Sequence, residues 1–305
     1  MKLLKEDLNL DFMGHRRIAA VVSSLVIAAG IIGFFTLGGL NYGIDFRGGT
    51  IVQVQFETPQ DIGALRDALT ADNIGSFTLQ TFGEETENEY LISVANADEA
   101  HLSEGEGAAQ VIEKTLTSKF QGASIRRVES VGPKVGEELK AKAWEAILFS
   151  ILAILLYVWM RFQWRYGIGS VVALIHDVLV VLTLFVFTGK EITLPVVAAI
   201  LTVAGYSIND TIVIFDRIRE NYLRFQKKKG LEIMNESINQ TLTRTLLTSG
   251  TTMFVLVSIF LFGGEIINDF AFALLVGVLV GTYSSIYIAS PVLLFLNQRF
   301  PAKSN

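Results

Sequence analysis

The chain has 305 residues, of which 51% are hydrophobic and 18% are charged, and its mean hydropathy is +0.46. This composition is too apolar and too weakly charged for an ordinary soluble protein, so it predicts an integral membrane protein. Cysteine is absent, which excludes disulfides, thiolate metal sites and cysteine nucleophiles, and the net charge of −5 argues against a nucleic-acid partner.

Six apolar stretches are each long enough to cross a bilayer, which takes about 20 residues. They cover residues 18–37, 143–160, 168–187, 192–215, 245–262 and 270–296. The alternative for the first stretch is a cleavable signal peptide. Its apolar run is longer than the usual ~7–15 residues and no clear A-x-A site follows, so we interpret it as an uncleaved anchor.

About a hundred residues between the first two spans predict a small folded domain. In order they show a strand (50–57), a helix (59–73), strands (77–82 and 89–94), a helix (100–120) and a strand (123–131). This βαββαβ order is that of a ferredoxin-like unit. From residue 41 to 136 the domain carries 15 acidic and 7 basic residues, and nothing in it resembles a catalytic site.

Glycine-containing segments join this domain to the membrane spans at both ends. The first joint contains Gly43, Asp45, Gly48 and Gly49, and the second begins with Gly132 and Pro133. Paired glycines permit a sharp turn, so a hinge is one interpretation of these joints and a plain connector is the other.

His176 and Asp177 lie eight and nine residues into the third span, near its middle. A histidine beside a carboxylate can hold or pass a proton near neutral pH, so both residues are candidates for a proton pathway. The alternative for His176 is a hydrogen bond from one helix to another.

Asp210 is a carboxylate in the otherwise apolar fourth span. A charge at bilayer depth costs roughly 2.5–3.5 kcal/mol on insertion scales, so it predicts a functional role. We expect Asp210 and its neighbour Asn209 to lie on a polar half of the helix that faces a protein interior. The other members of that half are Thr202, Gly205, Tyr206, Val213 and Asp216.

Arg244 in the fifth span is the expected partner of Asp210. Asp210 lies 17 residues after Thr193, and Arg244 lies 18 residues before Phe262. These counts place them about 25 and 27 Å into two consecutive helices. An ion pair or a gated approach between them is therefore predicted. The alternative is that Arg244 snorkels to the interface while neighbours such as Ser207 satisfy Asp210.

Basic residues in the short connections predict the orientation. They precede the first span (Arg16, Arg17), separate the second and third spans (Arg161, Arg165) and follow the fourth span in the segment 217–229. Because Lys and Arg accumulate on the cytoplasmic side, both termini should be cytoplasmic and the domain periplasmic. For the run 227–229, contact with anionic membrane lipid is favoured over protein docking.

The predicted fold class is an α-helical polytopic membrane protein with six transmembrane helices and one α+β, ferredoxin-like periplasmic domain between helices 1 and 2. Residues 1–38 should form the cytoplasmic N-terminus and first span, 39–140 the domain, and 141–305 the other five spans with a cytoplasmic C-terminus. No P-loop, H-E-x-x-H or G-x-S-x-G motif is present, so we expect no enzyme activity, no metal and no cofactor.

Five motifs resemble the SecF family of bacterial protein-export membrane subunits, which belongs to the resistance-nodulation-division transporter group. They are GIDFRGGT (43–50), VGPKVG (131–136), HDV (176–178), GYSINDTIVIFDRIREN (205–221) and RTLLTSGTT (244–252). The long fourth-span motif is highly specific, whereas HDV alone is weak. Together the motifs cover nearly the whole chain.

The resemblance implies an inner-membrane complex with SecD, which has a similar six-span layout, beside the SecY, SecE and SecG channel and with YajC. It implies that proton movement assists late, SecA-independent export of unfolded polypeptides. In the family, the Asp of the NDT motif and the Arg that opens the RT motif belong to the proton path. Here these residues are Asp210 and Arg244.

Two other functions remain as alternatives. A small-molecule or lipid exporter of the wider transporter group should have a larger external domain or twelve spans in one chain, and this sequence shows neither. A passive scaffold that stabilises SecD and the channel would tolerate asparagine at position 210.

Overall fold

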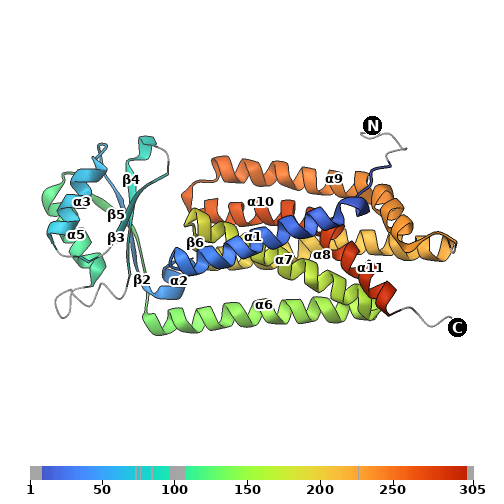
Figure 1. Cartoon of the computed structure of the whole chain (residues 1–305). Coiled ribbons are helices and arrows are strands. Elements are labelled where there is room, and N and C mark those ends of the chain that lie inside the picture. The colour runs from blue at the N-terminus through green and yellow to red at the C-terminus, as the bar shows by residue number, and fades with distance from the viewer. Residues whose placement is uncertain are drawn as a thin grey trace.

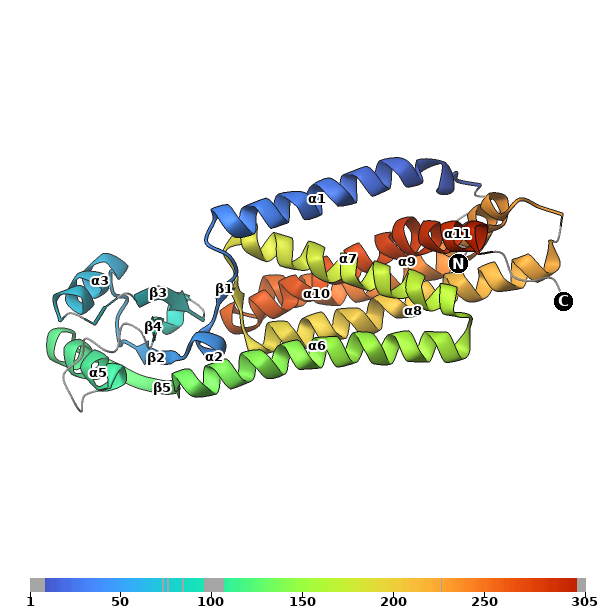
Figure 2. The same ribbon diagram turned by 60° about the horizontal axis from the view of Figure 1, so that its bottom comes forward.

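The computed structural model describes residues 9–72, 74–75, 77–83, 85–95, 107–225 and 227–300. A bundle of long helices carries a small α+β domain at one end (Figure 1). Six helical segments in the described residues are long and apolar enough to span a membrane, which confirms the predicted number. We call the end of the bundle next to the sheet the domain end, and the opposite end, where α1 begins and α11 ends, the terminal end (Figures 1 and 2).

The spans are built from seven helices and one irregular segment. In chain order they are α1 (Arg16–Thr36), α6 (Pro133–Arg161), α7 (Trp164–Thr188), α8 (Leu194–Arg224), α9 (Gly230–Phe262), α10 (Glu265–Ser284), the π-helical segment Ser285–Ala289 and α11 (Ser290–Arg299). A 3₁₀ turn, Met13–His15, precedes α1.

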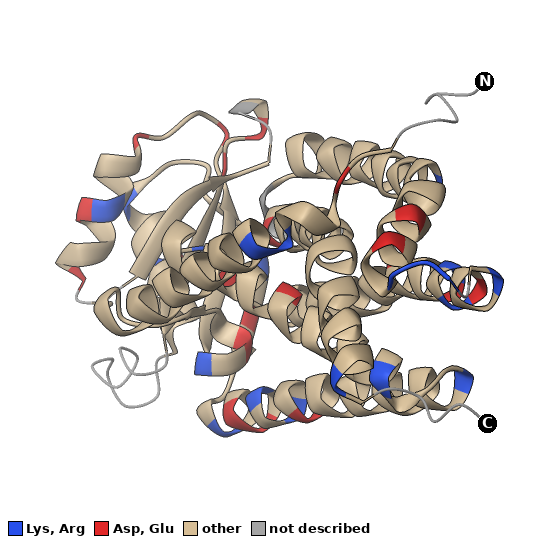
Figure 3. Cartoon of the chain, turned by 45° about the vertical axis from the view of Figure 1, so that its right-hand side comes forward, with Lys and Arg blue, Asp and Glu red and all other residues tan. Residues whose placement is uncertain are grey.

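Three of these helices extend by nine residues or more beyond the apolar runs that predicted them. Helix α6 begins at Pro133 instead of 143, α8 continues past 215 to Arg224, and α9 begins at Gly230 instead of 245. The polar extensions of α8 and α9 still bury one face, because buried Asn221 donates a hydrogen bond to buried Ser237 over 2.8 Å. A hydropathy window averages over both faces and therefore misses an amphipathic extension. Lys and Arg mark the connection between these extensions (Figure 3).

The domain has the predicted βαββαβ order. Its elements are β2 (Gly49–Gln55), α3 (Ile62–Ala71), β3 (Phe77–Phe82), β4 (Glu89–Ala95), α5 (Ala108–Lys119) and β5 (Ser124–Val131). The strands form an antiparallel sheet in the order β3-β4-β2-β5, which is the ferredoxin-like arrangement. The predicted start of the second domain helix, at 100, lies outside the described residues.

One face of this sheet packs on α3 and α5, which lie on the side away from the bundle (Figure 1). Alternate residues of β2 and β4 point into this core, as the period-two pattern predicts. The core residues from the strands are Val52, Val54, Ile92 and Val94, and those from the helices include Leu65, Leu69, Ile112 and Leu116.

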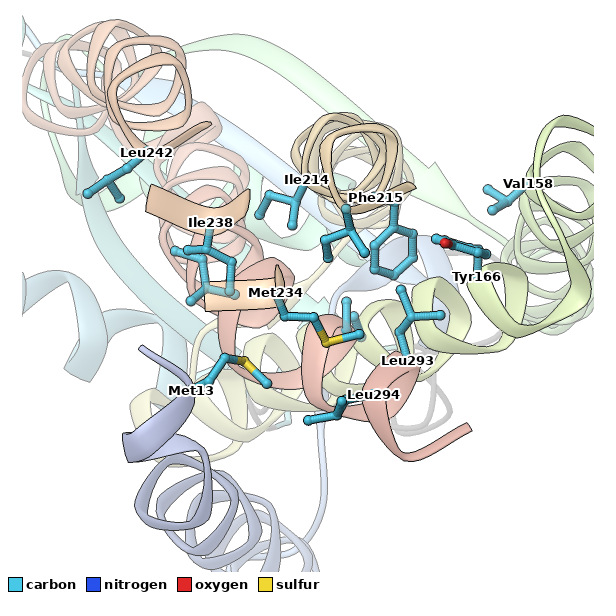
Figure 4. Close-up of a cluster of buried hydrophobic side chains, with 14 residues drawn as sticks. Met13, Val158, Tyr166, Ile214, Phe215, Met234, Ile238, Leu242, Leu293 and Leu294 are labelled. Carbon is cyan, nitrogen blue, oxygen red and sulfur yellow. The ribbon is translucent and has the colours of Figure 1, made fainter. Parts of the chain in front are cut away.

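Two apolar clusters hold the bundle together, one near each end. Figure 4 shows the terminal-end cluster, in which Met13 joins Met234, Ile238 and Leu294 from two later spans. The domain-end cluster includes Val181, Val203, Leu256 and Val276. Helices α7, α8 and α9 give buried residues to both clusters, and the sixth span does so through α10 at one end and the π-helical segment and α11 at the other. The stretch of each span between its two contributions forms the site described next.

Candidate functional site

A buried polar layer separates the two apolar clusters of the bundle. It lies on α7, α8, α9 and the α10–π segment, between the residues that each helix gives to the two clusters. Its members with hydroxyl, carboxyl or imidazole groups are His176, Asp177, Ser207, Asp210, Thr211, Ser249, Thr282, Tyr283, Ser284 and Ser285, and Ser23 on α1 joins them through His176. The three members with carboxyl or imidazole groups, His176, Asp177 and Asp210, are 6%, 0% and 3% exposed.

Asp210 lies in the buried stripe of α8. Residues Val203, Ser207, Asp210 and Ile214 are all buried, at the spacing of three or four that places residues on one helix face. Ser249 of α9 donates a hydrogen bond to Asp210 Oδ2 over 3.2 Å, and the Ser249 hydroxyl lies 2.7 Å from that of Thr282 on α10. Asp210 is thus linked to two neighbouring spans.

Arg244 and Asp210 form no ion pair in the described part of the chain. Arg244 is exposed on α9 and acts on the carboxylate only through space. The similar residue counts from Thr193 and Phe262 do not give Asp210 and Arg244 the same depth, because the start of α8 and the end of α9 lie at different levels. Ser249, five residues closer to Phe262, is the residue that reaches Asp210. The partner therefore comes from another helix and not from the neighbours Ser207 or Asn209.

Most of the polar half expected on α8 faces outward in this chain. Thr202, Gly205, Asn209 and Asp216 are exposed, whereas the apolar residues Ala204 and Phe215 are buried. Consecutive residues on a helix are about 100° apart, so Asn209 points in a different direction from Asp210. Within this chain Asp210 faces inward, whereas Asn209 belongs to a stripe of exposed residues on a membrane span.

His176 and Asp177 belong to the second part of the polar layer, where α1, α7, α8 and α10 meet. Asp177 Oδ2 accepts hydrogen bonds from Ser207 over 2.6 Å and from Ser284 over 2.8 Å. Its Oδ1 lies 3.0 Å from His176 Nδ1, and His176 Nε2 lies 3.0 Å from Ser23 Oγ on α1. The structure therefore brings His176 and Asp177 together, as expected, and adds three serines to them.

Four hydroxyl residues of the layer, Ser23, Thr282, Tyr283 and Ser284, were missed by the sequence reasoning. They lie in predominantly apolar spans, where serine and threonine usually serve helix packing. The signal that identifies them is positional. Each falls at the level of an ionisable residue on a neighbouring span, which becomes visible only when the spans are assembled.

Two glycines of α10 allow the close approach that completes the layer. A Cβ on Gly277 would overlap the side chain of Val203, and a Cβ on Gly281 would lie 2.9 Å from that of Ser207. Ser284 then follows one turn later and reaches Asp177. The π-helical segment begins directly after it, and its Ser285 hydroxyl lies 2.8 Å from that of Thr211.

The first joint is fixed to the bundle. Strand β1 (Asn41–Tyr42) pairs in parallel with β6 (Glu191–Ile192), and the short helix α2 (Ile44–Arg47) follows. Gly43 N–H donates to Ile192 O over 2.9 Å, and Asp45 Oδ2 accepts from Leu194 N–H, the first residue of α8, over 2.8 Å. Phe46 is buried in the domain-end cluster. The domain is therefore tied to the start of the helix that carries Asp210.

Two glycines of this joint are required by geometry. Gly48 and Gly49 have φ of +74° and +147°, which side chains rarely adopt, and a Cβ on Gly49 would overlap Val94 O. At the second joint, Pro133 occupies the first position of α6, which suits its fixed φ, and Gly132 precedes it with open space around it.

Charged residues fasten β6 to α10 beside the same joint. Lys190 Nζ forms an ion pair with Asp269 Oδ1 at 2.6 Å, and Asp269 Oδ2 accepts from Glu191 N–H over 2.9 Å. Burial, followed by the nearby charge of Asp269, raises the pKa of Glu191 above its ordinary value. The joint thus contacts both α8 and α10, the helices that also line the polar layer.

Replacing Asp45 with alanine should loosen the start of α8, because Leu194 N–H loses its acceptor. Loss of such a cap costs about 0.5–2 kcal/mol, so amide hydrogens in the first turn of α8 should exchange about two- to thirtyfold faster. Hydrogen exchange followed by mass spectrometry measures this. Asp45→Asn, which keeps an acceptor oxygen, should resemble the wild type.

The matched control is Asp61→Ala in the domain, where Asp61 accepts from Ala64 N–H over 2.9 Å at the start of α3. It should accelerate exchange in α3 and leave α8 unchanged. Equal exchange in α8 for the wild type and Asp45→Ala would contradict the capping role.

The chemistry available in the polar layer is the holding and passing of protons. Carboxylate, imidazole and hydroxyl groups from five spans lie within hydrogen-bonding distance in two connected sets, with apolar clusters on either side. Buried ionisable residues in a membrane span typically mark proton or ion pathways. Among the described residues no group of three or more His, Asp or Glu side chains is placed to hold a metal ion.

Two family models match the chain. The model described as protein export membrane protein SecD/SecF, C-terminal, matches residues 111–299, and the SecD/SecF GG motif matches residues 33–60. The second match contains the first joint, and the first match contains the complete polar layer except Ser23.

Curated relatives match over nearly their whole length. A protein translocase subunit SecF from Desulfurispirillum indicum is 44% identical over 95% of this chain and 93% of the relative. One from Vibrio alginolyticus is 46% identical over 97% of this chain and 92% of the relative.

Two solved structures are similar to this fold. A crystal structure of SecDF, a translocon-associated membrane protein from Thermus thermophilus, has a TM-score of 0.83 at 36% identity and covers 97% of this chain. SecDF in a super-membrane-facing form has a TM-score of 0.72 at 36% identity and covers 98% of this chain. In both cases this chain spans 40% of the other chain's length.

Proposed function

The chain belongs to the SecD/SecF family of protein-export membrane proteins, and on this premise we propose that it is a SecF-type subunit of the bacterial protein translocase. With SecD it would use the proton motive force to assist export across the inner membrane after the SecA-driven stage. The relatives named as translocase subunits support a role in transport.

The observation that carries the proton-coupled part is the buried position of Asp210. Its carboxylate is 3% exposed, lies 16 residues or about 24 Å into α8, and has a neutral hydroxyl as its bonded partner. A buried carboxylate without an ion-pair partner changes its interactions strongly when it takes up a proton. We assign Asp210, Arg244, Asp177 and His176 to the proton pathway, and place Asn209 on the exposed stripe beside it.

The proposed coupling runs along α8. Protonation neutralises Asp210, removes its attraction to Arg244 and weakens its acceptance of the Ser249 hydrogen bond, so the packing of α8 against α9 changes. Because Asp45 is bonded to the first residue of α8, a displacement of that helix reaches the domain through a fixed contact. The domain would then hold an emerging polypeptide in one state and release it in the other.

The exposed polar stripe of α8 supports a partner within the membrane. Thr202, Gly205 and Asn209 would otherwise face lipid, where polar groups are unfavourable. SecD, with six spans of its own, is the partner that we propose for this face. Beyond SecD, the proposed partners are SecY, SecE, SecG and YajC, exported unfolded polypeptides, and membrane lipid.

The proposed orientation places both termini in the cytoplasm and residues 39–140 in the periplasm. It rests on the basic residues Arg161, the last residue of α6, and Arg165, in the first turn of α7, at the terminal end of the bundle (Figure 1), together with the Lys and Arg between α8 and α9.

Inner-membrane vesicles that contain SecD and the translocase channel, with or without this chain, test the proposal. Vesicles with the chain should translocate a secretory precursor faster when a proton gradient is present, and a protonophore should abolish the difference. Tagged chain should also co-purify with SecD. Stimulation that survives the protonophore would favour a passive scaffold, and export of a dye or lipid without effect on the precursor would favour a small-molecule exporter.

A further inference from the structure

A chain of polar groups leads from His176 to α1 and points away from the domain. His176 Nε2 and Tyr283 Oη each lie 3.0 Å from Ser23 Oγ, and Tyr283 Oη donates to Ala19 O over 3.0 Å. Ser23 and His176 are each 6% exposed, so bulk water does not compete for these contacts. Neither Ser23 nor Tyr283 has a place in the pathway proposed above.

The other side of His176 is fixed by Asp177. The hydroxyls of Ser207 and Ser284 both donate to Asp177 Oδ2. An ionised carboxylate only accepts hydrogen bonds, so Asp177 Oδ1 accepts from the Nδ1–H of His176. This arrangement suits the imidazole in both its neutral and its protonated form. The proton that distinguishes the two forms is then the one on Nε2.

Ser23 can bond Nε2 in either form. When the imidazole is neutral, the Ser23 hydroxyl donates to Nε2. When a proton has arrived, Nε2–H donates to Ser23, whose own hydroxyl hydrogen rotates toward Tyr283 Oη, and Tyr283 continues to donate to Ala19 O. One proton is gained, the bond between Nε2 and Ser23 reverses its direction, a bond from Ser23 to Tyr283 Oη forms, and no buried polar atom loses its partner.

We propose that His176 Nε2 holds a proton separate from the one on Asp210, and that Ser23 and Tyr283 are the positioning residues that make both forms of His176 possible. This inference rests on the proposed proton-coupled function. It adds a branch of the pathway between α1 and α10, directed toward the terminal end of the bundle.

The surroundings of His176 leave few other groups to take this proton. On α7 the neighbour is Asp177, on α10 it is Tyr283, and on the π-helical segment it is Tyr287, whose ring stacks near that of Tyr283. On α8, Asp210 lies one turn beyond Ser207. Helix α1 has no ionisable residue from 18 to its end at Thr36.

Nitrogen NMR of the imidazole tests the proposal directly. The chain has three histidines, so His15→Gln and His101→Gln leave His176 as the only ¹⁵N-labelled histidine in full-length chain reconstituted with SecD. On acidification the signals should change from a neutral Nδ1–H tautomer to the imidazolium. In Ser23→Ala the ratio of imidazolium to neutral imidazole at a fixed pH should fall about fivefold, because the bond lost from the charged form is stronger than the bond lost from the neutral form. Tyr283→Phe should lower it less.

Matched controls are available beside each residue. Ser24 is the exposed neighbour of Ser23 on α1, and Tyr287 packs beside Tyr283, so Ser24→Ala and Tyr287→Phe should keep the wild-type imidazolium fraction. A single tautomer at every pH would overturn the proposal. So would an equal imidazolium fraction in Ser23→Ala and Ser24→Ala.

The export assay separates this proposal from the broader function. Ser23→Ala should reduce gradient-dependent stimulation, while Asp210→Asn should leave the protonation of His176 intact. If Asp210→Asn exports normally, the proposed function fails, but the imidazole signals still decide the role of Ser23. If Asp210→Asn loses stimulation and Ser23→Ala keeps both stimulation and imidazolium, only the present inference fails.

Discussion

Asp210→Asn is expected to abolish the gradient-dependent part of protein export while the protein remains folded. The amide cannot gain or lose a proton, so α8 would stay in one packing state whatever the gradient. Asparagine is nearly the same size as aspartate and keeps an oxygen that accepts from Ser249, so the folding cost should be about 1 kcal/mol or less. Precursor translocation into vesicles, with and without a protonophore, measures the effect.

The control for this substitution is Asp216→Asn on the same helix. Asp216 is exposed and forms an ion pair with Arg161 at 3.7 Å, an arrangement worth about 0–1 kcal/mol. Removing its charge should leave stimulation unchanged. If Asp210→Asn retains full stimulation, Asp210 has no part in the coupling and the scaffold alternative gains support.

Gly277→Ala is expected to destabilise the bundle by about 1–3 kcal/mol, the usual cost of overpacking. The new methyl would overlap the Val203 side chain, so α10 must move away from α8. That movement would also carry Ser284 away from Asp177, and the polar layer would lose one of its hydrogen bonds. Thermal unfolding of the purified protein in detergent measures the loss.

A second substitution shows whether contact with Val203 causes the destabilisation of Gly277→Ala. Val203→Ala removes the methyls that the new Cβ would meet, so the double variant Gly277→Ala with Val203→Ala should be more stable than Gly277→Ala alone. Gly250 on α9 has open space where a Cβ would be, and Gly250→Ala should be neutral or stabilising by up to about 1 kcal/mol. Equal melting of Gly277→Ala and the wild type would contradict the close-packing argument.

At the first joint, the glycines alone did not indicate how the segment is held against the membrane spans. The sequence suggested a hinge or a connector at Gly43, Gly48 and Gly49. In the structure this segment includes a paired strand, a buried phenylalanine and a carboxylate bonded to α8. Its partners lie about 150 residues further along the chain, so local sequence could not reveal them. Coupling between domain and spans then depends on this contact as well as on glycine flexibility.

The sequence by itself determined the six spans, the βαββαβ order and the presence of costly ionisable residues at Asp177 and Asp210. Hydropathy and periodicity are local properties of the sequence, and the thickness of the hydrocarbon core of the bilayer sets the minimum number of apolar residues in a span. The five motifs also carried the family resemblance, because each preserves residue type and spacing along one helix or turn.

Only the tertiary structure decided which side chains meet. It paired Asp210 with Ser249 instead of Arg244, turned Asn209 to the surface, and joined His176 to Ser23 on the first span. These outcomes depend on the relative level, rotation and separation of helices, which close packing at Gly277 and Gly281 fixes. Residue counting along single helices cannot supply those quantities, and they are what brings hydroxyls from separate spans to the buried carboxylates.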